Sequence, residues 1–138
     1  MEENFIEKLK KASEDGLFSQ HLGIKPLEVK PGFAKVELVV KDEHLNLHGT
    51  CHGAVIFAAL DEAFQLASNS HGTTAMALSV SINYLAAAKK GDRLTAEASE
   101  VGKTRRTGNY KFVVLNQNGE SITFGQGIVY RKDDEFKL

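Results

Sequence analysis

The spacing of apolar and charged residues changes along this chain of 138 residues. Residues 3 to 15 carry one apolar stripe among charged side chains, which predicts a short amphipathic helix that ends at Gly16. Residues 34 to 40 instead alternate with a period close to two, the pattern of a half-buried strand. Residues 22 to 29 resemble a weaker strand. Because Pro26 cannot donate a backbone hydrogen bond, we expect this strand to lie at a sheet edge or to contain a bulge.

A long apolar helix and four further strands follow. Residues 53 to about 69 are rich in Ala, Leu and Phe around most of the helix circumference, so we expect this helix to be covered on most sides. Strands beside one covered helix predict a single α+β domain over residues 1–138, in which a mainly antiparallel sheet wraps around that helix. Turn residues such as Gly91-Asp92 and Asn118-Gly119 separate pairs of the later strands. These strands are expected over residues 76–85, 93–101, 108–116 and 121–131.

Composition and charge exclude several classes of protein. An apolar fraction of 42% and a charged fraction of 25% are those of a globular domain rather than of a disordered or fibrous chain. A net charge of −1 gives no basic surface field for nucleic acid or anionic lipid. The charged N-terminal segment lacks the apolar core of a signal sequence, and acidic residues interrupt the one run that approaches a membrane span. We expect a cytoplasmic protein that binds neither nucleic acid nor membrane.

Histidines and the single cysteine precede the long helix. His44, His48 and His52 are four residues apart, but the segment between them is a poor helix former. The spacing therefore does not predict a stripe of metal ligands, and we expect no metal ion. Cys51 could be a nucleophile with His52 as its base. Because adjacent side chains at a helix start point about 100° apart, a small buried thiol is the simpler interpretation.

The long helix contains two further features that suggest chemistry. Gly53 lies in its first turn, where a backbone N–H backed by the helix dipole could stabilise an oxyanion; alternatively, the glycine serves only the turn into the helix. Asp61 interrupts the apolar middle of the helix. A carboxylate there must pair with a basic residue of the sheet, be protonated, or face a cavity as a general base or nucleophile. Its neighbour Glu62 is expected to be solvated or to form a surface ion pair.

Helix geometry makes it difficult for one chain to use both groups on one substrate. Gly53 and Asp61 are eight residues apart, which separates them by about 12 Å along the helix axis and by about 80° around it. Two such helices, antiparallel across a two-fold axis, would place Gly53 of one chain opposite Asp61 of the other. The spacing therefore predicts a homodimer or homotetramer with active sites at a subunit interface.

The segment N-L-H-G-T-C-H-G-A-V-I-F-A-A-L-D-E-A, residues 46 to 63, resembles a known enzyme family. It is similar to the hotdog-fold acyl-CoA thioesterases of the phenylacetic-acid-degradation type, in the 4-hydroxybenzoyl-CoA thioesterase superfamily. The resemblance extends over nearly the whole chain. It implies a hotdog fold and the hydrolysis of an acyl- or aryl-CoA thioester to a free acid and CoA, with no metal or organic cofactor.

The resemblance also implies a role for each matching residue. Asn46 is implied to hold the thioester and the attacking water. Gly53 is implied to donate the oxyanion hydrogen bond, with His52 beside it. Asp61 of the partner subunit would act as general base, or as a nucleophile that forms a mixed anhydride. Ser79 on the following strand would assist the water, although an ordinary polar strand face is the alternative.

Four basic residues are candidates for binding the phosphates of CoA. Lys89, Lys90, Arg105 and Arg106 are expected in or near the turns on either side of the strand over residues 93–101. Their alternative role is that of solvated turn charges.

Two other functions remain open at this stage. A hotdog-fold hydratase or dehydratase resembles a pattern in which a His follows the Asp at short spacing, and no His lies between Asp61 and Ser68. A non-catalytic acyl-CoA sensor would keep the pocket without a water-activating acid, so Asp61 together with Asn46 favours the enzyme.

Overall fold

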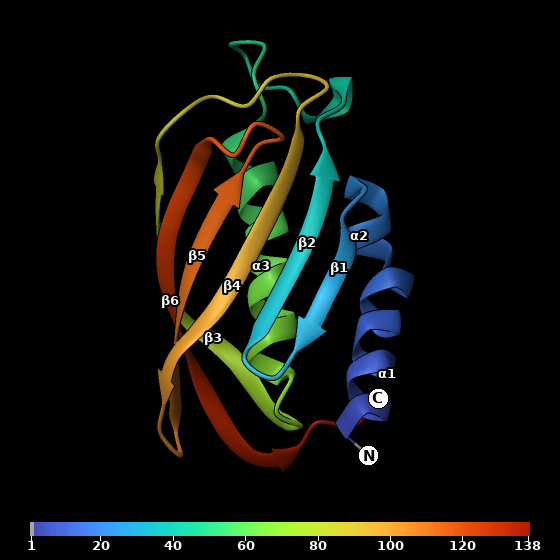
Figure 1. Cartoon of the computed structure of the whole chain (residues 1–138), viewed down its shortest axis with the longest axis vertical. Helices are drawn as coiled ribbons and strands as arrows, with labels where there is room; N and C mark the ends of the chain where they lie inside the picture. The colour runs from blue at the N-terminus through green and yellow to red at the C-terminus, as the bar shows by residue number, and fades with distance from the viewer. Residues whose placement is uncertain (1) are drawn as a thin grey trace.

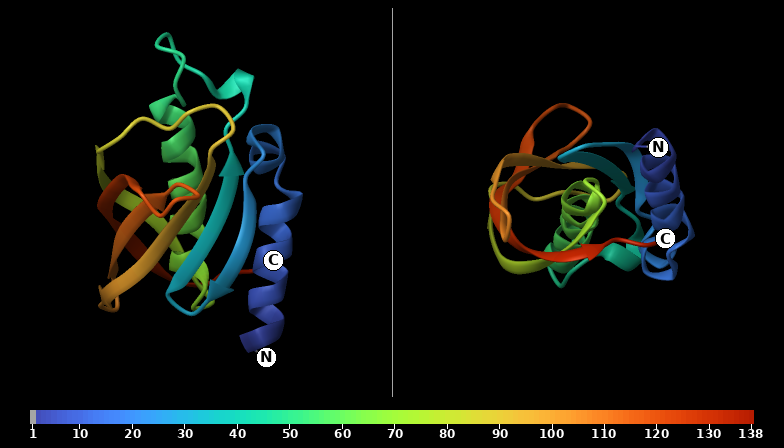
Figure 2. Two further views of the ribbon diagram at one scale, coloured as in Figure 1. Left: turned by 45° about the horizontal axis from the view of Figure 1, so that its top comes forward. Right: turned by 90° about the horizontal axis from the view of Figure 1, so that it is seen from below.

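A six-stranded antiparallel sheet curls around one long helix in the computed structural model, which describes residues 2–138 (Figure 1). The helix, α3, spans Gly53–Asn69, as predicted. Seen from below, the sheet surrounds much of the circumference of α3 (Figure 2). The strand order is β1-β2-β4-β5-β6-β3. The strands are β1 Lys25–Lys30, β2 Phe33–Val39, β3 Thr73–Tyr84, β4 Arg93–Lys103, β5 Thr107–Leu115 and β6 Ser121–Glu135.

The N-terminal part of the chain contains one helix that the sequence pattern did not predict. The amphipathic helix α1 spans Glu2–Asp15, and after Gly16 a second helix, α2, spans Leu17–Leu22. The expected strand over residues 22–29 is therefore wrong at its start, since α2 ends there and Gly23, with φ 81°, turns the chain before β1. A six-residue helix has fewer than two turns, so its sequence carries little periodicity.

The rest of the β1 prediction is confirmed. β1 forms one edge of the sheet, and its pairing with β2 shifts register between Pro26 and Glu28. Helix α1 packs alongside β1 (Figure 1) and so protects this edge. None of the helices within residues 2–138 has the length and apolar composition needed to cross a bilayer.

The core lies between α3 and the inner face of the sheet. Phe64 of α3 packs against Tyr110 and Phe112 of β5, with ring centroids 5.5 and 4.8 Å apart. Gly127 of β6 provides room for this aromatic cluster, because a Cβ there would lie 2.6 Å from Phe112 and 2.9 Å from Phe64. Other fully buried side chains around α3 are Val36, Leu38, Leu60, Leu66, Val114, Ile122 and Val129. This packing fixes the rotation of α3 about its axis.

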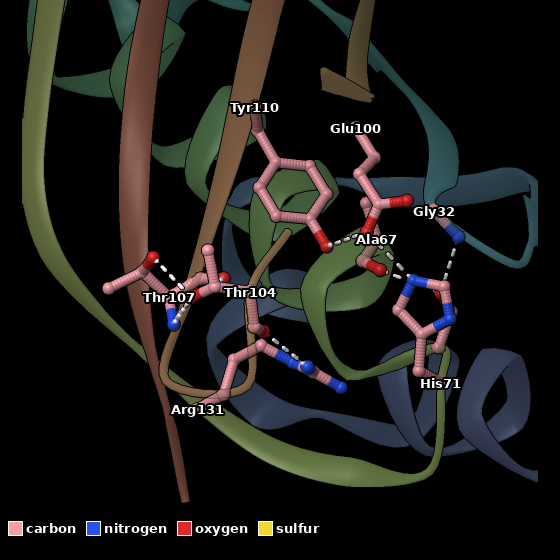
Figure 3. Close-up of polar contacts among 9 residues, drawn as sticks. Gly32, Ala67, His71, Glu100, Thr104, Thr107, Tyr110 and Arg131 are labelled. Atoms are coloured by element: carbon pink, nitrogen blue, oxygen red, sulfur yellow. Dashed lines mark hydrogen bonds and ion pairs between the residues drawn. The ribbon is translucent and has the colours of Figure 1, made fainter. Parts of the chain in front are cut away.

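Polar contacts hold the chain at the C-terminal end of α3 (Figure 3). His71 Nε2 lies 3.0 Å from Oε1 of Glu100 on β4, and the buried Tyr110 hydroxyl donates to the same oxygen at 3.4 Å. The Ser70 hydroxyl accepts the Gly32 N–H, in the turn between β1 and β2, at 2.8 Å. The end of α3 is thus connected to both β4 and the β1–β2 turn.

Thr123 of β6 offers a test of core packing. Its side chain is fully buried, and its hydroxyl has no hydrogen-bond partner within residues 2–138. A buried unpaired hydroxyl costs about 1–3 kcal/mol. Because valine has a similar shape without the polar group, we expect Thr123→Val to raise the free energy of unfolding by about 1 kcal/mol in urea denaturation. Thr95→Val is the control, since Thr95 of β4 is only partly buried. A Thr123→Val protein that is no more stable than the wild type would contradict this account.

Candidate active site

Asn46 organises the loop that leads into α3. Its Oδ1 accepts the N–H of His48 at 2.9 Å and that of Thr50 at 3.1 Å, while its Nδ2 donates to the Thr50 hydroxyl at 3.0 Å. Gly49, with φ 75°, provides the left-handed turn at the loop tip. The Asn46 amide therefore sets the shape of the loop immediately before α3.

Within residues 2–138, Gly53 carries the one backbone donor at the N-terminus of α3 that lacks an acceptor. His52 is the N-cap: its Nδ1 accepts the Ala54 N–H at 3.0 Å, and its carbonyl accepts the N–H groups of Val55 and Ile56 at 2.9 and 3.3 Å. The Gly53 N–H has no acceptor among residues 2–138. Because the other donors of this turn are occupied, the positive end of the helix dipole is presented through Gly53. An oxyanion donor requires this arrangement.

The Gly53 donor lies at a cavity of about 350 Å³. Tyr84, the last residue of β3, forms part of its wall and donates its hydroxyl to the Gly53 carbonyl at 2.9 Å. Sequence reasoning missed Tyr84, whose one signal is an aromatic residue at the end of a strand pattern. The other lining residues are Asn46, Thr50, Cys51, Ile56, Leu85, Ala86, Ala87 and Ala88.

Asp61 lines a different cavity, of about 220 Å³. The walls of this second cavity include Phe64 of α3 and residues 75–77 of β3, and it shares no residue with the Gly53 cavity. Asp61 is exposed in the single chain, and its carboxylate has no hydrogen-bond or ion-pair partner within residues 2–138. The alternative that Asp61 pairs with a basic residue of the sheet is therefore wrong for the single chain. Desolvation by its surroundings raises the pKa of Asp61 above 3.8.

Glu62 differs from the prediction of a solvated side chain or a surface ion pair. It is half-buried, and its Oε2 accepts the hydroxyls of Ser13 at 3.2 Å and Ser19 at 2.9 Å. The prediction was wrong because Ser19 lies on α2, the helix that the pattern did not reveal. Of the two neighbouring acids, Glu62 is held by the N-terminal helices and Asp61 is left without a partner.

Ser79 lies outside both cavities of the single chain. It follows a register shift in β3 and pairs with Ile128, which is partly exposed. Ala77, before the shift, pairs with the buried Val129, and both line the Asp61 cavity. Paired residues share a sheet face, so Ser79 shares the face of Ile128. Its role in positioning water stays a prediction.

Lys89 and Lys90 follow the wall of the Gly53 cavity directly, since residues 86–88 line it. Both side chains are exposed, and Lys90 forms an ion pair with Asp42 at 2.8 Å. These two lysines are therefore near the Gly53 cavity, and their role in binding CoA phosphates stays a prediction.

Arg105 and Arg106 lie at the other end of β4, in the turn before β5. Both guanidinium groups are 3.2 Å from Asp133. Because β4 has 11 residues, its ends are about 33 Å apart. In a single chain the two basic pairs are therefore too far apart to border the same cavity, and the role of either pair in binding CoA phosphates stays a prediction.

Cys51 is buried, and it does not form a thiol–imidazole pair. Its Sγ lies 3.7 Å from the His52 carbonyl oxygen, while the His52 ring caps α3. Desolvation raises the pKa of Cys51 to about 11. The three histidines do not form a stripe either, since His44 is buried whereas His48 and His52 are exposed.

The chain is similar to proteins of a known family. The model of a family described as "Thioesterase superfamily" matches residues 48–123, more than half of the chain. This chain belongs to the thioesterase superfamily. The matched segment includes Gly53, Asp61 and the wall of the Gly53 cavity from Tyr84 to Ala88.

Individual relatives cover most of the chain. Acyl-coenzyme A thioesterase PaaI of Escherichia coli is 34% identical over 118 residues, which are 86% of this chain and 84% of that protein. The solved structure of E. coli PaaI gives a TM-score of 0.88 at 31% identity and covers 92% of each chain. A protein of Archaeoglobus fulgidus that bears only a provisional esterase name is 48% identical over 122 residues, 88% of this chain and 79% of that one.

A third likeness involves a ligand. The structure of a Streptococcus mutans protein bound to acetyl CoA gives a TM-score of 0.78 at 29% identity, with 82% of this chain and 91% of that chain covered. Together these likenesses confirm the hotdog fold and show a thioester hydrolase of the PaaI type. They favour hydrolysis over the hydratase and sensor alternatives.

The raised pKa of Cys51 predicts slow alkylation. With a pKa of about 11, only about one thiol in ten thousand is ionised at pH 7. We expect iodoacetamide to modify Cys51 far more slowly than N-acetylcysteine, and the rate to rise about tenfold per pH unit in alkaline buffer. Intact-protein mass spectrometry measures both rates. Rapid alkylation near neutral pH would contradict a buried, protonated thiol.

Proposed function

We propose that the protein hydrolyses acyl- or aryl-CoA thioesters to a free acid and CoA, in sites formed between two copies of the chain. Within residues 2–138, the Gly53 N–H beside one cavity and the Asp61 carboxylate beside another both lack a hydrogen-bond partner, and this observation carries the proposal. The name of the E. coli relative and the acetyl CoA bound to the S. mutans relative support a CoA ester as substrate.

β3 provides a means of joining two copies. It is the last strand in the sheet order, so its outer edge has no partner strand within residues 2–138. Large apolar side chains are exposed in and just after it, namely Met76, Leu78, Tyr84 and Leu85. A long, exposed apolar edge of this kind favours pairing with another strand. We infer that the β3 strands of two copies pair antiparallel about a two-fold axis.

That pairing would bring the two cavities together. Along β3, residues 75–77 line the Asp61 cavity and Tyr84 lines the Gly53 cavity. An antiparallel pairing centred near Val80 puts the Tyr84 end of one strand beside residues 75–77 of the other. Gly53 of one chain and Asp61 of the partner subunit would then line one site. Two antiparallel α3 helices, one from each chain, would likewise place Gly53 of one chain opposite Asp61 of the other.

The same pairing would unite the two basic pairs. Arg105 and Arg106 directly precede Thr107, the first residue of β5. Thr107 pairs with Tyr130 of β6, and Tyr130 pairs in turn with Met76 of β3. Met76 lines the Asp61 cavity. In the proposed dimer, these arginines of one chain would therefore approach the site that the partner's Lys89 and Lys90 border. Phosphate groups of CoA favour such a mixed basic surface.

In the proposed reaction, the thioester carbonyl oxygen accepts the N–H of Gly53, which stabilises the oxyanion of the tetrahedral intermediate. Asp61 of the partner subunit removes a proton from the attacking water, or attacks the carbonyl carbon to form a mixed anhydride that water then cleaves. The C–S bond breaks and the sulfur takes up a proton, from protonated Asp61 in the general-base route or from solvent in the anhydride route, so that CoA is released as the thiol. The raised pKa of Asp61 makes it a stronger base than an ordinary carboxylate.

Three further residues support this chemistry in the proposal. Asn46 borders the Gly53 cavity and would orient the thioester and water. The His52 ring accepts the N–H of Ala54, so that this second donor does not compete with Gly53 for the thioester oxygen. Ser79 would assist the water from the β3 strand near the interface.

Asp61→Asn tests the general base. We expect kcat to fall by about 10²–10⁴-fold, measured as thiol release from a panel of acyl- and aryl-CoAs. Because the ionised form is the active one and its pKa is raised, wild-type kcat/KM should decline with falling pH through a midpoint above 3.8. The raised pKa also means that ionised Asp61 disfavours the folded state at neutral pH, so Asp61→Asn should raise the melting temperature. A variant with unchanged kcat would exclude Asp61 as the base.

Gly53→Pro tests the oxyanion donor. Proline deletes the N–H, and His52, with φ −61° and ψ 134°, already has the conformation that precedes proline. Gly53→Ala is the matched control, since it adds a Cβ but keeps the N–H. We expect Gly53→Pro to lower kcat by about 10²–10³-fold relative to Gly53→Ala. Equal rates for the two variants would show that this N–H is not used.

Mixing two inactive variants tests whether the site is shared. In a heterodimer of Asp61→Asn and Gly53→Pro chains, one of the two sites combines an intact Gly53 with an intact Asp61. Random pairing of equal amounts should restore about one quarter of the wild-type rate after co-expression, because half of the dimers carry one intact site. Recovery also shows that both variants fold. No recovery, or an active wild-type monomer by light scattering, would contradict a shared site.

A further inference from the structure

Tyr84 contacts the first turn of α3 in two ways. Its hydroxyl donates to the Gly53 carbonyl at 2.9 Å. Its ring lies against the α-carbon of the same residue, because a Cβ built on Gly53 would be 3.2 Å from Cζ and 3.4 Å from Cε1. The close approach of this ring is a second physical reason for glycine at position 53.

The contact differs from the others that hold this turn. Cys51 donates its N–H to the Ala88 carbonyl at 2.8 Å, and His52 donates its N–H to the His44 carbonyl at 2.7 Å. Both bonds fix the chain before Gly53. Among the described residues, the Tyr84 hydroxyl is the side-chain group from outside α3 that bonds to Gly53 itself.

We propose that Tyr84 is a positioning residue that holds Gly53 through its α-carbon and its carbonyl, so that the backbone N–H attached to that α-carbon faces the cavity before substrate arrives. The inference rests on the proposed function, since it concerns the same oxyanion donor. A donor that is already aligned stabilises charge in the transition state without reorganisation. Tyr84 acts through Gly53 and does not itself contact the reacting atoms.

Two observations support a permanent role for the hydroxyl. Partial burial raises the pKa of Tyr84 above 10.0, so the hydroxyl stays protonated and remains a donor over the neutral and mildly alkaline range. In addition, Tyr84 ends β3, whose pairing with β6 reaches Thr123 directly opposite. The hydrogen bond therefore connects the helix N-terminus to a paired strand rather than to a loop.

Tyr84→Phe tests the proposal, because it keeps the ring and removes the hydroxyl. We expect kcat to fall about tenfold while KM stays within about twofold, since alignment of the donor matters most in the transition state. We also expect the Gly53 amide resonance to shift in ¹H–¹⁵N spectra. Tyr110→Phe is the matched control: it removes a buried hydroxyl that bonds to Glu100 at the far end of α3, and should lower the melting temperature without lowering kcat.

The outcomes separate this inference from the proposed function. If the wild-type protein releases no thiol from any CoA ester, the proposed function fails. If the wild type is active and Tyr84→Phe keeps its kcat, or raises KM alone, the positioning role is overturned while the hydrolase stands. If Tyr110→Phe lowers kcat as much as Tyr84→Phe, a general loss of packing explains both, and the positioning role is again overturned.

Discussion

The burial of α3 inside the curved sheet is the constraint on which the other features depend. The aromatic contacts of Phe64 with Tyr110 and Phe112 prevent the helix from rotating, and the polar contacts around Ser70 and His71 fix its C-terminal end. A rigid helix keeps Gly53 and Asp61 about 12 Å apart along its axis. No rearrangement of loops within one chain can shorten that distance. The geometry of the core therefore keeps the two groups apart within one chain, which is the basis for proposing a site between two chains.

Two neighbouring acids on α3 illustrate how the surroundings separate structural from functional groups. Glu62 accepts two hydroxyl hydrogen bonds from the N-terminal helices and so links α1 and α2 to α3. Asp61, on the adjacent position of the helix, has a raised pKa and no partner among residues 2–138. An unpaired, partly desolvated carboxylate lowers stability, and such groups are concentrated at functional sites. Of these two acids, the one that has no partner within residues 2–138 is the one that the proposal assigns to the reaction.

Sequence reasoning succeeded where the determining forces are local. The bounds of α3 follow from an apolar run and an N-terminal glycine, and the strands follow from alternation. It failed for Glu62 because Ser19 is 43 residues away in the sequence and lies on a helix too short to show a period. Tyr84 was missed for the same reason, since its bond to Gly53 spans 31 residues. Contacts between segments distant in the sequence leave no pattern in either segment alone.

The edge of β3 that has no partner strand within residues 2–138 bears on how the proposed activity could be lost. Paired strands can slip along each other where their register is weakly specified. A slip of two residues leaves each side chain on the same face of the sheet. It would nevertheless displace one chain along the other by about 7 Å, more than half of the separation between the two functional groups of α3. Both chains would remain folded and associated, yet no site would be complete. In the proposed dimer, a variant can therefore be inactive because two intact subunits are misaligned.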